Sequence, residues 1–471
     1  MILNDIVDGI GRRVEGAGQT ISGVFEPTIR LGVTGLSRAG KTIFITSLVA
    51  NLLNRNRMSQ LRAASSGGIQ AAYLHPQPDD TVPRFDFETH LGALTGADPV
   101  WPSSTRSISQ LRLSLRVQPT GLLSGLSGPR TVHLDIVDYP GEWLLDLGLL
   151  DKSYAAWSRE SLARAARRPQ AADYLAALGA SDPTARLAEP DAKKLATLYT
   201  AYLREISAAG LSDCTPGRFL LPGDLDGSPV LTFAPVTLDG SAPRASLYRE
   251  FERRYEAYKS KVVKPFFRDH FARIDRQIVL VDALGAIHAG PQAVEDMRAA
   301  MADILAAFRP GQNTWLGQIF MGRRVEKILF AATKADHLHH AQHARLTAIM
   351  RALLREARER AEFAGATTSA MSLASVRATI EQSVAHDGAA LDMVRGRLLS
   401  SGKDAAFFAG ALPEDPAEIL GPARDGARTW LDADYAAMDF APALVSHGGA
   451  EGLPHIRLDR AAEFLIGDRL R

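Results

Sequence analysis

The residues GLSRAGKT, from Gly35 to Thr42, match the phosphate-binding pattern G-x-x-x-x-G-K-[ST]. In this pattern Gly35 and Gly40 let the backbone turn its N–H groups around a β-phosphate, and Lys41 supplies positive charge to the β- and γ-phosphates. We expect the Thr42 hydroxyl to bind Mg²⁺, at the positive end of the helix that it opens. The same nucleotide-binding loop should include the three residues that precede Gly40: Ser37, Arg38 and Ala39.

A second group of candidate residues follows the apolar run LDIVD. Asp138, at the end of that run, can hold Mg²⁺ directly or through water, and Gly141 can present its N–H to a γ-phosphate. Glu142 stands where a glutamine commonly orients the attacking water. A glutamate there can act as a base or repel the γ-phosphate, so we expect slow intrinsic hydrolysis. The pattern D-x-x-G is weak alone and gains weight from its place after a phosphate loop.

A third group, TKAD, ends another apolar run. Asp336 can accept two hydrogen bonds from N1–H and the exocyclic amine of guanine, which adenine cannot offer. Lys334 can lie along the base and brace the phosphate loop. Read alone, Asp336 would be an ordinary helix N-cap; its order and location favour guanine. Thr333 has no side-chain amide with which to tie this segment to the phosphate loop, so the preference for guanine should be looser.

The elements around these motifs predict an α/β fold. Apolar runs bounded by turn residues indicate strands, and a period of three or four residues indicates helices. Strand, phosphate loop, helix, paired strands and strand–helix–strand follow in the order of a P-loop NTPase with a Ras-like G domain, a mostly parallel sheet and covering helices. Residues 55–104 show little periodicity and are expected to form a long loop region. The predicted strands are 28–36, 110–117, 131–138, 276–284 and 325–333; the predicted helices are 41–54 and 293–308.

A large helical insertion interrupts this order. Within it, six apolar residues recur every three or four positions and should form a packed helical stripe: Leu247, Phe251, Tyr255, Tyr258, Val262 and Phe266. Pro265 should kink or divide that helix. The expected organisation is an N-terminal helix (1–27), a first G-domain part (28–146), the helical insertion (147–275), a second G-domain part (276–385) and a C-terminal α/β extension packed on the G domain (386–471).

Five blocks occur in the order GVTGLSRAGKT, WPSSTRSISQLRLSLR, DYPGEWLLDL, TKAD and SLASVRAT. The chain resembles the GTP-binding domains of the translation-factor and Ras-like class, and more closely the YcjX family of bacterial P-loop proteins over nearly its whole length. The resemblance implies GTP or GDP with Mg²⁺ as cofactors, and a place in the cytoplasm or at the periphery of the inner membrane. It also implies a role in stress responses and an effector, for which a small membrane protein is a candidate.

The resemblance also implies further site residues. Thr105, in a switch loop, would bind Mg²⁺ and the γ-phosphate. Arg106 would either stabilise the transition state in cis or be a solvated or phosphate-neutralising arginine. After the last core strand, Ser375 and Val376 would meet the base, with the Val376 N–H facing the guanine carbonyl.

Composition argues against several classes of protein. A net charge of +1 gives no general electrostatic case for binding nucleic acid. No apolar run approaches the roughly 20 residues of an integral membrane segment. A single cysteine, Cys214, rules out an intramolecular disulfide. The histidine-rich stretch 337–343 is expected to be an exposed, polar helix start rather than a metal site.

The preferred interpretation is a GTP-binding regulatory protein with slow, Mg²⁺-dependent GTPase activity. Its switch loops would relay the nucleotide state to the helical insertion. An ATPase or small-molecule kinase would use the same loop, but it would have no role for Asp336. A nucleotide-binding scaffold without turnover is the third alternative, and its partners should ignore the nucleotide state.

Overall fold

The structure is a computed structural model that describes residues 26–35, 39–103, 107–118, 128–209, 211, 214–306, 325–363, 365–386, 389–430, 435–445, 449 and 451–471. Most of the expected N-terminal helix lies outside these residues. So do four expected site residues: Ser37, Arg38, Thr105 and Arg106.

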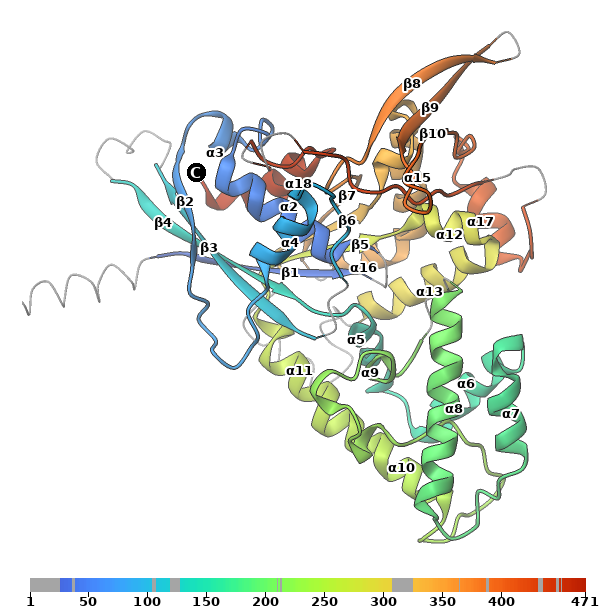
Figure 1. Cartoon of the computed structure of the whole chain (residues 1–471). Helices are drawn as coiled ribbons and strands as arrows, with labels where there is room; N and C mark the ends of the chain where they lie inside the picture. The colour runs from blue at the N-terminus through green and yellow to red at the C-terminus, as the bar shows by residue number, and fades with distance from the viewer. Residues whose placement is uncertain are drawn as a thin grey trace, which may run out of the picture.

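A seven-stranded sheet in the order β2-β3-β4-β1-β5-β6-β7 forms the centre of the molecule (Figure 1). Strands β4, β1, β5, β6 and β7 run parallel, while β2 pairs with β3, and β3 with β4, in antiparallel fashion. The fold is therefore the mostly parallel α/β fold that the sequence predicts. The strands are β1 (Thr28–Gly35), β2 (Ile69–His75), β3 (Ser109–Val117), β4 (Arg130–Asp138), β5 (Arg276–Val281), β6 (Lys327–Ala332) and β7 (Thr367–Ser372).

Helices cover both faces of this sheet. β5 is buried at every position, as expected for a parallel strand with helices on both sides. One apolar core joins the sheet to α2 (Lys41–Asn54), α4 (Phe87–Thr95) and α18 (Leu458–Ile466). A second core joins its other face to helices that include α13 (Pro291–Ala306), and continues into the insertion. The remaining helices of the sheet region are α3 (Arg62–Ser65), α12 (Ala283–Ala289), α15 (His343–Leu353), α16 (Arg355–Phe363) and α17 (Ala417–Arg424).

The helical insertion projects from the second face, at the lower right of Figure 1. All six residues of the predicted apolar stripe are buried. The stripe follows α10 (Leu247–Tyr258), a π-helical turn (Lys259–Val263) and α11 (Lys264–Asp269), so the helix divides at Pro265 as predicted. The short helix α5 (Glu142–Leu145) directly precedes the insertion. The other α-helices of the insertion are α6 (Tyr154–Ala165), α7 (Ala172–Gly179), α8 (Glu189–Ala208) and α9 (Gly217–Leu220).

The expectation of a long loop over residues 55–104 is wrong. The segment contains α3, the edge strand β2 and α4, whose first turn is capped by Asp86 accepting a hydrogen bond from Thr89 N at 3.3 Å. β2 has the sequence IQAAYLH and is mostly half-buried or exposed. Its small and polar residues give no clear alternation, because an edge strand that faces solvent does not need it.

A second, three-stranded sheet follows the core: β8 (Thr379–His386), β9 (Ala389–Arg397) and β10 (Asp404–Phe407), in the order β10-β9-β8. The domain boundary expected at 385/386 falls within the β8–β9 hairpin, and the division into domains stays a prediction. Before α18, the chain forms an isolated antiparallel bridge between Ala374 and Ile456. Across the described ranges, no helix combines the length and the hydrophobicity that crossing a membrane requires.

Candidate functional site

The phosphate loop lies at the carboxyl end of β1. β1 ends at Gly35 and α2 begins at Lys41, whose Nζ donates a hydrogen bond to the Gly35 carbonyl at 2.8 Å. Gly40 has a φ of 82°, a left-handed conformation that favours glycine. At Gly35, a Cβ would lie 2.6 Å from the Leu280 carbonyl oxygen, so this close approach of β1 and β5 requires glycine. Ala39 is buried, and Thr42 is the second residue of α2.

Asp138 ends β4 at the same edge of the sheet, because it pairs in register with Val33, two residues before the end of β1. Asp138 and Thr42 are 1% and 6% exposed. A buried carboxylate and a buried hydroxyl at one sheet edge are hard oxygen donors of the kind that Mg²⁺ prefers. The residues present therefore fit the magnesium ion that a nucleotide would bring.

Glu142 opens α5 directly after Gly141. It is 5% exposed, and its Oε2 atom has no hydrogen-bond partner within the described part of the chain. A carboxylate buried in this way is costly unless it meets a proton, a water or another group. Its place after Gly141 is the place that the sequence assigned to a residue facing the γ-phosphate.

A cavity of about 280 Å³ brings the expected base-recognition residues together with the phosphate loop. Asp336 is held there: its Oδ2 accepts a hydrogen bond from Ala378 N at 2.9 Å, and its carbonyl accepts one from the Thr379 hydroxyl. The expected site residues that line the cavity are Ala39, Gly40, Lys334, Asp336, Ser375 and Val376.

The same cavity has walls that the motifs do not indicate: Trp101, His337, Leu399, Asp439 and Phe440. The indole N–H of Trp101 donates to the Phe440 carbonyl at 2.7 Å, and the His337 and Phe440 rings meet edge to face at 5.2 Å. Trp101 stands in the sequence block WPSSTRSIS, so the sequence could have indicated it as a site residue. Phe440 is more than 60 residues beyond the last motif, and tertiary packing alone brings it here.

Lys334 lines the base cavity, and its expected role along the base stays a prediction. It adopts a left-handed conformation, with a φ of 57°, and its ammonium group lies 2.5 Å from Asp282 Oδ2. Asp282 follows β5 and also caps α12 through Gly285 N at 2.9 Å. The Thr333 hydroxyl donates to the Val281 carbonyl at 3.3 Å, so it ties the end of β6 to β5.

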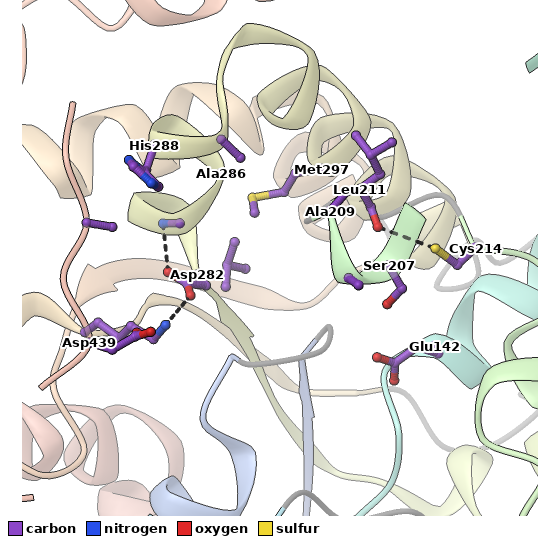
Figure 2. A pocket seen from close by; sticks show the side chains of 16 residues that line it. Glu142, Ser207, Ala209, Leu211, Cys214, Asp282, Ala286, His288, Met297 and Asp439 are labelled. Carbon is purple, nitrogen blue, oxygen red and sulfur yellow. Dashed lines mark hydrogen bonds and ion pairs between the residues drawn. The ribbon is translucent and has the colours of Figure 1, made fainter. Parts of the chain in front are cut away.

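A second cavity, of about 460 Å³, adjoins the first through shared walls at Lys334 and Asp439 (Figure 2). Glu142 forms part of its lining, with Ser207 and Cys214 of the helical insertion and His288 of α12 on other sides. The space beside Glu142 is therefore bounded by the insertion as well as by the sheet region.

The segment after Gly141 is anchored in the insertion. It comprises α5 and the 3-10 helix η1 (Asp146–Leu149). Asp146 Oδ1 accepts a hydrogen bond from Gly217 N at 2.8 Å, and its Oδ2 accepts one from the Tyr258 hydroxyl at 2.5 Å. Complete burial raises the pKa of the Asp146 carboxyl to about 7, although both hydrogen bonds oppose the shift.

Trp143 makes a second set of contacts between α5 and the insertion. Its indole N–H donates to the Leu221 carbonyl at 3.1 Å, and the Arg218 guanidinium lies 3.2 Å from the centre of its ring. A cation held over an indole is attracted by the ring's negative face. A movement of α5 would therefore be transmitted to Arg218, within α9, and to Leu221, directly after it.

The expectation of an exposed, polar helix start at 337–343 is wrong in part. His343 is 2% exposed, and its Nε2 donates to the Ala335 carbonyl at 2.7 Å. Burial lowers the pKa of this imidazole. His343 thus fixes the turn that carries Asp336, while His337 lines the base cavity.

The chain is similar to known proteins over most of its length. The profile of a family described as YcjX-like family, DUF463, matches residues 29–470. A protein of Escherichia coli (strain K12) named "Ras-like GTPase YcjX" is 39% identical over 457 residues, covering 94% of this chain and 96% of its own length. A protein of the same name from Shewanella oneidensis is 35% identical over 468 residues, covering 94% of each chain.

Proposed function

Because this chain belongs to the YcjX-like family, we propose that it is a GTP-binding regulatory protein and a slow, Mg²⁺-dependent GTPase. The observation that carries the proposal is the cavity in which Asp336 faces the same space as Gly40 of the phosphate loop. Relatives that cover more than nine-tenths of the chain carry the name Ras-like GTPase, which supports the same assignment.

Guanine recognition would rest on Asp336. Its Oδ2 is already held by Ala378 N, so the carboxylate is oriented before a base arrives. A preorganised carboxylate can accept hydrogen bonds from the N1–H and the exocyclic amine of guanine without first paying to be ordered. The backbone N–H of Val376, across the same cavity, would donate to the guanine carbonyl oxygen.

Phosphate binding would rest on Lys41 and on the backbone of the loop. Lys41 Nζ now contacts the Gly35 carbonyl, and a β- or γ-phosphate would give it a charged acceptor near the same place. Thr42 and Asp138 would hold Mg²⁺, which neutralises phosphate charge when bound. The roles at the phosphates that the sequence suggests are also proposed for Ser37, Arg38, Thr105 and Arg106.

Hydrolysis would be slow because a glutamate stands after Gly141. A second negative charge close to the γ-phosphate opposes nucleotide binding, unless the carboxyl is protonated or orients water as a base. Burial of Glu142, at 5% exposure, strengthens either effect, since charges interact more strongly where solvent is excluded.

The nucleotide state would reach the insertion through α5. A γ-phosphate that attracts the Gly141 N–H would shift Glu142 and Trp143. Because Trp143 contacts Leu221 and Arg218, the shift would reach the insertion. Loss of the phosphate would release that segment, which would then become disordered or shift. From its resemblance to the family, we further propose action in the cytoplasm or at the inner-membrane periphery, in a stress response, with a small membrane protein as candidate effector.

The test is a titration of labelled GTP, GDP and ATP onto tag-free protein with Mg²⁺, alongside the variants Asp336→Ala and Lys41→Ala. We expect GTP and GDP to bind more tightly than ATP, and Asp336→Ala to remove that preference. Lys41→Ala should weaken all three. Tighter binding of ATP, or a preference unchanged in Asp336→Ala, would contradict the guanine assignment and favour an ATPase or kinase. Bound GTP that is never hydrolysed would favour the scaffold.

A further inference from the structure

A cluster of metal-ligating side chains lies outside the nucleotide site, between the turn after Asp336 and the β8–β9 hairpin. His339 and His340 come from the turn, and Glu381 comes from β8. One nitrogen of each imidazole and one carboxylate oxygen all lie within 4.8 Å of one another. Two segments separated by about 40 residues thus present three potential ligands to one point.

The distances fit a small metal ion. Glu381 Oε2 lies 3.8 Å from His339 Nε2 and 2.7 Å from His340 Nδ1. Zinc bonds of about 2.0–2.1 Å in tetrahedral geometry place neighbouring ligand atoms about 3.3 Å apart. Shifts of about half an ångström, within the freedom of partly exposed side chains, would bring Glu381 Oε2 to that separation from each imidazole nitrogen.

The cluster also has the supporting partner that a histidine ligand needs. His339 Nδ1, the nitrogen away from Glu381, lies 3.5 Å from Asp392 Oδ2 and accepts a hydrogen bond from Ala341 N at 3.4 Å. In the tautomer that ligates through Nε2, Nδ1 would carry the proton and would donate to Asp392 instead. Asp392 is oriented in turn by the Ser383 hydroxyl at 2.5 Å, directly across the β8–β9 hairpin. A carboxylate that accepts the N–H of a ligating imidazole fixes its tautomer and turns Nε2 toward the metal.

The carboxylate is prepared to act as a ligand. Arg377 lies 3.5 Å from Oε1, the oxygen that does not face the imidazoles. Arg377 can therefore orient the carboxylate without occupying the position of a metal on Oε2.

We propose that His339 Nε2, His340 Nδ1 and Glu381 Oε2 form a binding site for a divalent transition metal of the zinc type, with Asp392 as the supporting partner of His339. Water completes the coordination on the exposed side, where His340 is 68% exposed. Mixed nitrogen and carboxylate ligands select zinc, cobalt or nickel over magnesium. The site is separate from the proposed magnesium ion at Thr42 and does not rest on the proposed GTPase activity.

A metal bound here would join the two segments that hold Asp336. The turn Ala335–His337 carries Asp336 and precedes His339, while the Thr379 hydroxyl at the start of β8 donates to the Asp336 carbonyl. The metal would cross-link these segments and reduce their independent motion, so it would stabilise the fold around the base cavity. A gain in thermal stability on adding metal is the expected consequence.

The test uses tag-free, chelator-treated full-length protein without nucleotide and in excess Mg²⁺. Zn²⁺ is titrated by calorimetry, and Co²⁺ by visible absorption, which reports nitrogen and oxygen ligands directly. We expect one equivalent of each metal to bind. His339→Ala and Glu381→Gln should each weaken binding about tenfold or more, and Asp392→Asn should weaken it about tenfold while keeping the Co²⁺ spectrum.

His75→Gln is the matched control, because His75 is an exposed histidine on β2, outside the cluster. It should leave affinity and stoichiometry unchanged. Circular dichroism establishes that each variant is folded. Absence of saturable Zn²⁺ binding to wild type, or equal binding by wild type, folded His339→Ala and folded Glu381→Gln, would overturn the proposal. The His340–Glu381 contact would then be an ordinary surface ion pair.

Discussion

Among the contacts between the insertion and the segment after Gly141, the one at Gly217 leaves the least room for a side chain. A Cβ on Gly217 would overlap the backbone carbonyl of Glu142 and lie 3.0 Å from Trp143 N. Because these are backbone atoms, no rotamer change can relieve the overlap. In Gly217→Ala, the first turn of α5 must move by about 1 Å to restore van der Waals contact.

The energetic and kinetic effects of Gly217→Ala should differ in size. Overpacking of this kind costs about 1–3 kcal/mol, so the protein should remain folded with a lowered thermal midpoint. A displacement of about 1 Å near reacting groups can cost up to about a hundredfold in rate, and we expect kcat for GTP hydrolysis to change by at least about tenfold. GDP affinity should stay within about threefold, because Asp336 and the phosphate loop lie on other elements.

The assay is single-turnover GTP hydrolysis, with GDP binding measured in parallel. Gly148→Ala is the matched control: it lies in η1 of the same segment, and a Cβ there would meet nothing within 4 Å. It should behave as wild type in both measurements. A folded Gly217→Ala variant with the wild-type hydrolysis rate would refute the coupling of the insertion to Glu142.

Two further predictions concern the walls of the site. Because burial raises the pKa of Asp146 from 3.8 to about 7, its contribution to folding stability is fully present below about pH 4 and is lost as the pH rises to about 7. Asp146→Asn should therefore flatten the pH dependence of urea unfolding between those values; an unchanged profile would show that Asp146 does not titrate there. Trp101→Ala removes an aromatic wall of the base cavity and its hydrogen bond to Phe440, and should weaken GTP and GDP binding about tenfold, measured by fluorescent-nucleotide titration. Equal affinity in Trp101→Ala would place the base elsewhere.

The sequence predicts the sheet because its central strands obey a simple rule. β5 and β6 are buried on both faces, so apart from the first two residues of β5 and the first of β6 their sequences are continuous apolar runs. β2 escapes prediction, because half-exposed Ala71 and Ala72 carry no alternation. Its existence depends on pairing with β3, which is a tertiary property of the chain.

The candidate site likewise combines residues that the sequence predicts with residues that only the folded chain brings there. Gly40, Lys41 and Asp336 follow from motifs, because each lies at the carboxyl end of a predicted strand or the start of a predicted helix. The ion pair between Lys334 and Asp282, and the arrival of Phe440 at the base cavity, depend on which loops fold over that edge. Local periodicity carries no information on such long-range contacts.

The histidine-rich turn also depends on long-range contacts that the sequence does not reveal. The sequence offers no partner for His339, since the nearest acidic groups in space are Glu381 and Asp392, more than 40 residues away. Only the packing of β8 and β9 against the turn supplies them. A metal site with ligands on separate segments is recognisable once the fold is known.

The central claim, that Asp336 reads guanine, is tested most directly by exchanging its hydrogen-bond pattern. In Asp336→Asn, the side-chain oxygen can still accept from Ala378 N while the amide presents a donor to the base. Xanthine has a carbonyl where guanine has its exocyclic amine. The measurement is the ratio of GTP to XTP affinity in wild type and variant. We expect wild type to prefer GTP and Asp336→Asn to prefer XTP, each by about tenfold or more; the same ratio in both proteins would contradict the account.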